Sequence, residues 1–185
     1  MKKLLTVASL LALVALPAWA GGIGVAYSTW DTGDASDDQG IGIKIEFDVG
    51  RFVDFELRST WLDELAISSQ GHAFRLEATP VDIGVSTDFL HDGKIQPFLG
   101  GGFSFVFLNA HVDSDAVVRT DDEAGWYAVA GLEGNVNERF TMYGEVLYRD
   151  VRAEFTSDGF LNRDFIDFGA DLSGAGANFG VMLSW

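Results

Sequence analysis

Three histidines and the acidic residues beside them are the side chains best suited to general acid–base chemistry in this sequence. His111 lies two residues before Asp113, His91 directly precedes Asp92, and His72 stands apart. A histidine held by a carboxylate activates a hydroxyl group or a water molecule in many enzymes. That chemistry needs a mutual geometry which these spacings do not supply by themselves. We therefore predict that the histidines are ordinary loop or rim residues, that the protein is not an enzyme, and that it carries no catalytic, cofactor-binding or metal site.

Charged side chains recur at every second position of several segments. In residues 41–49, apolar residues take the odd positions, and glycine, lysine, glutamate and aspartate take the even ones. This period of two excludes a helix and predicts a β-strand. Seven acids and three bases share the polar faces of such strands, so they cannot all pair with one another. These residues are Lys44, Glu46, Asp48, Asp54, Glu56, Arg58, Asp82, Glu133, Glu145 and Arg149.

The same alternation predicts about eight strands of roughly ten residues each, the size of the smallest outer-membrane barrels. Short connections at 50–51, 91–93 and 135–137 alternate with longer polar ones at 31–39, 63–71, 109–123 and 156–168. We therefore predict an all-β fold, an eight-stranded antiparallel up-and-down transmembrane β-barrel. Its short turns would be periplasmic and its longer loops extracellular. The segment from Arg75 to Pro80 does not fit simply, and either a bulge near Pro80 or a strand that projects above the membrane would explain it.

The apolar faces decide between a soluble barrel and a membrane barrel. A soluble ligand-binding barrel encloses apolar side chains, whereas here the narrow interior would receive the charged ones. An apolar exterior around a polar interior is expected in lipid. The aromatic residues fall near the two ends of the strands, with Trp30, Trp61 and Trp126 at the long-loop end and Phe140 and Trp185 at the short-turn end. Two such belts are typical of the two membrane interfaces.

The first twenty residues read as an export signal. Lys2 and Lys3 precede an apolar run from Leu4 to Leu16, which is too short to span a bilayer. Ala18 and Ala20 fit the small-residue pattern before a signal-peptidase cut. We expect a cleaved signal peptide at 1–20, a barrel domain at 21–185, and export to the bacterial outer membrane.

Composition narrows the set of partners. The chain has 185 residues, no cysteine and a formal net charge of −16. The absence of cysteine excludes disulfides and a thiol nucleophile, and the acidic balance argues against a nucleic-acid partner. The acidic loops are expected to form a solvated surface. A sharper alternative is that divalent cations bridge them to lipopolysaccharide phosphates.

Three segments resemble bacterial outer-membrane β-barrel proteins. They are residues 96–102 (QPFLGGG), 145–150 (EVLYRD) and the closing 179–185 (FGVMLSW). The nearest group is the small eight-stranded OmpA/OmpX-like barrel family. This resemblance implies a monomer that contacts outer-membrane lipid and lipopolysaccharide. It also implies that the barrel assembly machinery reads a C-terminal signal formed by Phe179, Val181, Leu183 and Trp185.

Two other functions stay open beside a structural or surface-interaction role. A narrow, porin-like channel would require the interior side chains to swing aside, because eight strands leave an interior just filled by side chains. A lipid A-modifying enzyme is the less favoured alternative. Lipid A palmitoyltransferases use His, Asp and Ser near the outer rim, and His72 with Ser68 or Ser69 only partly resembles that arrangement.

Overall fold

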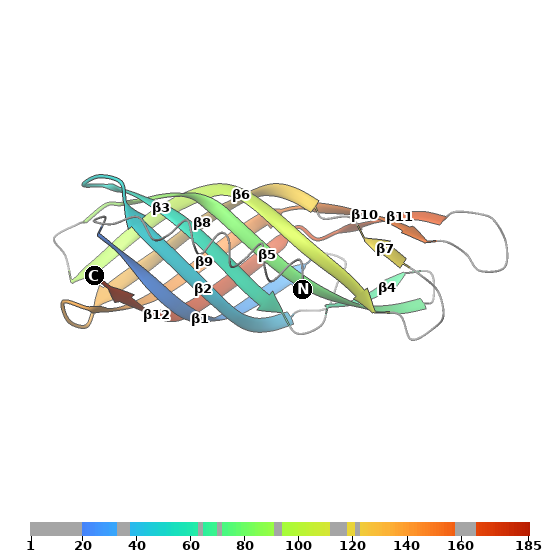
Figure 1. Cartoon of the computed structure of the whole chain (residues 1–185), viewed down its shortest axis with the longest axis horizontal. Helices are drawn as coiled ribbons and strands as arrows, with labels where there is room; N and C mark the ends of the chain where they lie inside the picture. Colours follow the sequence, from blue (N-terminus) through green and yellow to red (C-terminus); the bar gives the residue numbers. More distant parts are fainter. Residues whose placement is uncertain are drawn as a thin grey trace.

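Eight antiparallel strands close into a barrel in the computed structural model, which describes residues 20–32, 38–62, 65–69, 72–90, 94–111, 118–120, 123–157 and 166–185 (Figure 1). The barrel strands are β1 (Gly21–Thr32), β2 (Asp38–Asp48), β3 (Val53–Leu62), β5 (His72–Asp88), β6 (Ile95–His111), β8 (Glu123–Asn135), β9 (Phe140–Asp150) and β12 (Gly174–Ser184). β1 pairs with both β2 and β12, and pairing of β3 with β5 completes the ring. The predicted eight-stranded up-and-down barrel is confirmed.

Four further strands extend the wall at one end of the barrel. They are β4 (Leu65–Ser69), β7 (Val118–Thr120), β10 (Arg152–Ser157) and β11 (Ile166–Asp171). β10 and β11 continue the register of β9 and β12 without a slip, from Leu183↔Phe140 to Ser157↔Ile166. Figure 1 shows these strands projecting beyond the barrel, so segments that we expected to be loops are partly strand.

The opposite end carries the short connections. Residues 49–52 and 136–139 join consecutive strands there, and β5 ends and β6 begins at the same end. Asn137 tightens the last of these turns, because its side-chain oxygen accepts hydrogen bonds from the backbone N–H groups of Arg139 and Phe140. The C-terminus lies at this end (Figure 1), and the N–H of Trp185 donates to the carbonyl of Gly21 at 3.0 Å. The barrel therefore has a short-turn end and an extended end.

The outer face of the wall is apolar and the inner face is polar, as the alternation predicts, except inside the barrel toward the extended end. Large apolar side chains cover the outside, among them Val25, Phe103 and Val146. The charged residues face inward. Trp30, however, is only 1% exposed and lies inside the barrel, so its assignment to an aromatic belt is wrong. It belongs to an apolar layer toward the extended end whose other buried members are Leu62, Ala78, Val106, Leu108, Val151 and Leu172.

The segment from Arg75 to Pro80 is a projecting strand. β5 keeps one register with β6 from Asp88↔Phe98 to Arg75↔His111, so there is no bulge on that side. On its other side β5 pairs with β3 only as far as Ser59↔Val81, within the described residues. β4 then resumes the pairing one residue out of step, at Leu65↔Leu76.

Pro80 explains why the β3–β5 ladder stops. The N–H of Asp88 donates to the carbonyl of Phe52, so even-numbered residues of β5 point their N–H groups at β3. Pro80 is even-numbered and has no N–H to donate. The ladder therefore ends at the neighbouring Val81.

In the described parts of the chain, no helix has the length and apolar character needed to cross a membrane.

Candidate functional site

The interior of the barrel holds a cluster of ion pairs around Lys44. The ammonium group of Lys44 contacts the carboxylates of Glu46, Glu133 (3.1 Å), Glu56 and Glu145 (both 3.6 Å). These acids come from β2, β8, β3 and β9, so the contacts cross the barrel rather than follow one strand. A buried ammonium is tolerable only when several acceptors replace its water shell.

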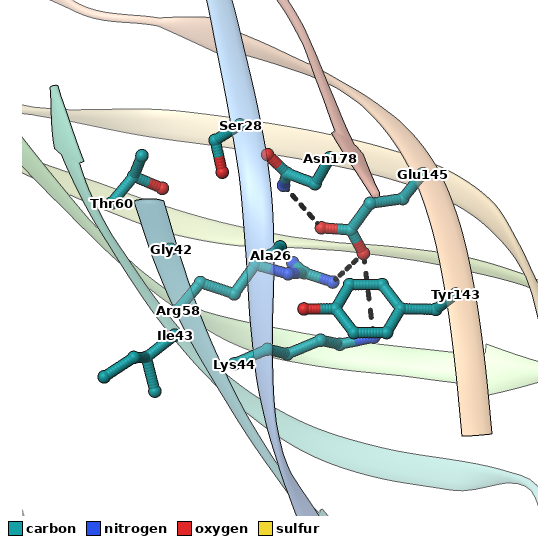
Figure 2. A pocket seen from close by; sticks show the side chains of 10 residues that line it. All are labelled: Ala26, Ser28, Gly42, Ile43, Lys44, Arg58, Thr60, Tyr143, Glu145 and Asn178. Carbon is teal, nitrogen blue, oxygen red and sulfur yellow. Dashed lines mark hydrogen bonds and ion pairs between the residues drawn. The ribbon is translucent and has the colours of Figure 1, made fainter. Parts of the chain in front are cut away.

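Arg58 forms the second centre of this cluster. Its Nη2 lies 2.7 Å from Glu56 and 3.2 Å from Glu145. Glu145 also accepts a hydrogen bond of 2.7 Å from the amide of Asn178 on β12. Figure 2 shows Lys44, Arg58 and Asn178 converging on the Glu145 carboxylate from different strands. Glu145 therefore joins β2, β3, β9 and β12 through side chains alone.

A separate ion pair lies closer to the extended end. Arg149 donates to both oxygens of Asp82, from Nη2 at 2.7 Å and from Nε at 3.2 Å. The hydroxyl of Ser104 donates to the same carboxylate at 2.7 Å. The guanidinium of Arg149 also lies over the ring of Trp30, 5.1 Å from its centroid. Three donors thus satisfy an aspartate that is fully buried.

Eight of the ten predicted interior charges therefore take part in these two groups, and two do not. Asp48 is exposed and Asp54 is half-buried, and they lie opposite each other in the β2–β3 pair, next to the short turn. Both residues lie on the inward face of their strands, but at the mouth of the barrel, where they are accessible to water. Part of the excess of acidic over basic residues therefore lies at the rim of the barrel.

Aromatic rings and glycines complete the interior beside the charged side chains. The ammonium of Lys44 lies 4.6 Å from the ring centroid of Phe98 and 4.8 Å from that of Tyr143. The guanidinium of Arg58 lies over the ring of Tyr127. Glycine makes room for these rings: a Cβ on Gly180 would meet the Tyr143 hydroxyl at 2.8 Å. A glycine opposite a large inward side chain is the sequence signal for such packing.

The histidines and the acids near them, which we predicted to be ordinary residues and not a catalytic centre, are only partly described by the structure. His91 lies outside the described residues, as do Asp113 and the loop acids at 121–122. His72 and His111 lie in the extended parts of β5 and β6. Within the described residues, no group of three or more histidines or acids is placed to hold a metal ion.

The last strand closes the barrel. Phe179, Val181, Leu183 and Trp185 all face outward and are 43–59% exposed. β12 pairs with β1 from Thr32↔Gly174 to Gly22↔Ser184. These four residues therefore lie on the outer face of the seam between the first and last strands, and their role as an assembly signal stays a prediction.

Comparison with known proteins agrees with this architecture. The family model described as the outer membrane protein beta-barrel domain matches residues 4–184. The fold is similar to that of OprG from Pseudomonas aeruginosa, with a TM-score of 0.79 and 13% identity over 91% of this chain and 96% of that one. It is also similar to AlkL in DMPC lipid bilayers (TM-score 0.67, 13% identity, 92% of each chain) and to Neisserial surface protein A (TM-score 0.59, 12% identity, 90% of this chain and 97% of that one). No curated protein matches the sequence.

Proposed function

Because the chain belongs to the outer membrane β-barrel family, we propose that it is a non-enzymatic barrel closed to ions along its axis. Its role is then structural, or it lies in surface interaction through the strands at its extended end. On this proposal the short turns face the periplasm and the extended strands face the outside of the cell. Outer-membrane lipid and lipopolysaccharide surround it, and it works as a monomer.

The cluster around Lys44 and Arg58 is the observation that carries this proposal. Its side chains come from β2, β3, β8 and β9 and meet near the axis, so they occupy the cross-section that an ion would use. Glu56 is fully buried and Arg58 is 3% exposed, which shows how little solvent reaches this layer. The apolar layer that includes Trp30 and Val106 lies beyond it. An ion would have to break several buried ion pairs and then cross apolar side chains.

Planar-bilayer recording tests closure directly. The folded wild-type barrel is expected to give no steady single-channel steps. A variant that truncates both barriers, Trp30→Ala/Glu56→Ala/Arg58→Ala/Glu145→Ala, is expected to conduct, because it removes three side chains of the cluster around Lys44 and Arg58 and the largest side chain of the apolar layer. Asp48→Ala is the matched control, since Asp48 stands at the solvated mouth. Steady steps from the wild-type protein, or no gain from the fourfold variant when it inserts normally, would contradict the proposal.

The break in the β3–β5 ladder favours a second candidate function, lateral passage of apolar molecules between the outer end of the barrel and the membrane. Thr60, Trp61 and Leu62 have no register partners on β5 among the described residues, since the pairing ends at Ser59↔Val81. The side chains of Leu62, Ala78 and Pro80 are buried there. Parting the two strands at this point breaks none of the ladder pairs in the described wall. This route does not pass through the cluster around Lys44 and Arg58, so it is compatible with a barrel that is closed to ions.

Pro80→Ala tests this second candidate, because it restores the N–H that β5 lacks toward β3. The variant is expected to extend the ladder, to protect the amide of residue 80 from hydrogen exchange, and to slow the uptake of N-phenyl-1-naphthylamine by cells that carry the protein. Pro97→Ala is the control, because Pro97 lies at the short-turn end of β6. Equal uptake by the wild type and by Pro80→Ala, at equal amounts of folded protein, would argue against a lateral route.

A further inference from the structure

A small cavity lies inside the barrel next to the ion pairs of Arg58 (Figure 2). It has room for about one water molecule. Residues of β1, β2, β3, β9 and β12 line it. Its polar lining residues are Ser28, Lys44, Arg58, Thr60, Glu145 and Asn178. Ser28 and Thr60 line it on the side of the apolar layer, and Lys44 lines it on the side of the other ion pairs, so it lies at the boundary of the cluster around Lys44 and Arg58.

Three polar atoms at this cavity have no hydrogen-bond partner among the described residues. They are the hydroxyl oxygen of Ser28 and the Nε and Nη1 atoms of Arg58. Ser28 is 2% exposed and Arg58 is 3% exposed, so bulk water does not reach them. An unpaired buried donor loses its hydration without compensation, and buried polar groups in proteins nearly always have a partner.

Gly42 is the reason that this space exists. A Cβ on Gly42 would lie 3.0 Å from the Ser28 hydroxyl oxygen and 3.4 Å from that of Thr60. Gly42 is the register partner of Thr60, and the neighbouring Gly40 is the partner of Ser28. The missing side chain therefore opens a space into which two hydroxyl groups and an arginine point.

We propose that this cavity is a binding site for a single buried water molecule. The water accepts a hydrogen bond from the free Nε–H group of Arg58. It exchanges hydrogen bonds with the hydroxyls of Ser28 and Thr60, which both donate and accept. Three partners are the usual number for an internal water. The water gives Arg58 a further partner on Nε, beside the contacts of its Nη2 with Glu56 and Glu145.

The charges around the cavity favour water over a small anion such as chloride. Lys44 and Arg58 are the two cations of the cluster, and Glu46, Glu56, Glu133 and Glu145 are its four carboxylates. An anion would enter a region that already carries excess negative charge and would lose its hydration as well. A neutral ligand that both accepts and donates meets neither penalty.

Nuclear magnetic resonance of the folded, 15N-labelled barrel in detergent micelles tests the site. The Nε–H of Arg58 is expected to show a rotating-frame cross-peak to water, and its sign separates through-space contact from proton exchange. Gly42→Ala fills the cavity and is expected to abolish this peak. Gly144→Ala is the matched control, because a Cβ there would meet only Phe179, at 3.7 Å, on the outside of the barrel. The control is expected to keep the peak.

Ser28→Val provides a second way to fill the site if Gly42→Ala does not fold, since its methyl groups replace the hydroxyl. Absence of the through-space peak in the folded wild type would overturn the proposal, as would its persistence in either filled variant. Replacing chloride by sulfate is expected to leave the Nε–H shift of Arg58 unchanged. A saturable dependence on chloride would also overturn it, in favour of an anion site.

Discussion

Each charged side chain that is buried in the described part of the barrel has an oppositely charged partner, but some of these partners can be replaced more easily than others. Lys44 has four carboxylates around it, so no single one is indispensable. Asp82 depends mainly on the bidentate guanidinium of Arg149, with Ser104 as its other donor. Removing one member of a buried pair leaves an uncompensated charge. We therefore expect substitutions at the Arg149–Asp82 pair to have the larger effect on stability.

Arg149→Met is expected to lower the free energy of unfolding by about 3–5 kcal/mol, because it strands the Asp82 carboxylate in the interior. Adding Asp82→Asn to this variant is expected to recover a large part of the loss, since the amide carries no charge. Urea unfolding followed by tryptophan fluorescence in detergent measures both values. A double variant no more stable than Arg149→Met would show that the buried charge is not the cause.

At the scale of the strands, glycine decides how closely the wall and the interior pack. A glycine on β12 and a glycine on β9 show this difference between the two faces of the wall. A Cβ on Gly180 would meet the carbonyl of Val25 and the ring and hydroxyl of Tyr143 inside the barrel. A Cβ on Gly144 would meet only Phe179 on the outside. The same substitution is therefore expected to be costly on the inner face and harmless on the outer one.

Gly180→Ala is expected to destabilise the barrel by about 1–3 kcal/mol, the usual cost of overpacking. Gly144→Ala is expected to change stability by no more than about 0.5 kcal/mol, as for most surface substitutions. Equilibrium unfolding in the same detergent compares the two variants. Equal losses would mean that the cost comes from the strand backbone and not from contact with Tyr143.

For the molecule as a whole, closure of the sheet is the property that membrane insertion requires. The eight-strand ring is closed along its main body, because β3 pairs with β5 as far as Ser59↔Val81 and β1 pairs with β12. Lipid-facing side chains such as Phe103 and Val146 are 69% and 63% exposed, which no water-soluble protein of this size would favour over so wide a band. The barrel is therefore expected to unfold only under strong denaturing conditions.

Gel mobility of the detergent-folded protein checks this expectation. The unboiled sample is expected to run as a compact species and the boiled sample to shift to the mobility of the unfolded chain. Circular dichroism of the unboiled sample is expected to show β structure. Solubility without detergent and identical mobility before and after boiling would instead indicate a secreted soluble barrel.

The sequence by itself determined the barrel and the face on which each charge lies. A strand has only two faces, so strict alternation from 41 to 49 and from 53 to 61 assigns Lys44, Glu56 and Arg58 to one side without further information. The alternation along the rest of the chain predicted about eight strands, and the order of short and long connections agreed with an up-and-down barrel. The same alternation in β1 places Trp30 with Ser28, although its aromatic character had suggested a membrane interface.

Only the tertiary structure decided which charges meet and which stay apart. The contacts of Glu145 with Lys44, Arg58 and Asn178 depend on the tilt and stagger of four strands, which sequence spacing does not encode. The same stagger leaves Asp48 and Asp54 at the mouth, and it brings the missing N–H of Pro80 opposite β3. The water site over Gly42 arises in the same way, because an empty space is defined by neighbours from several strands and not by the residue that leaves it.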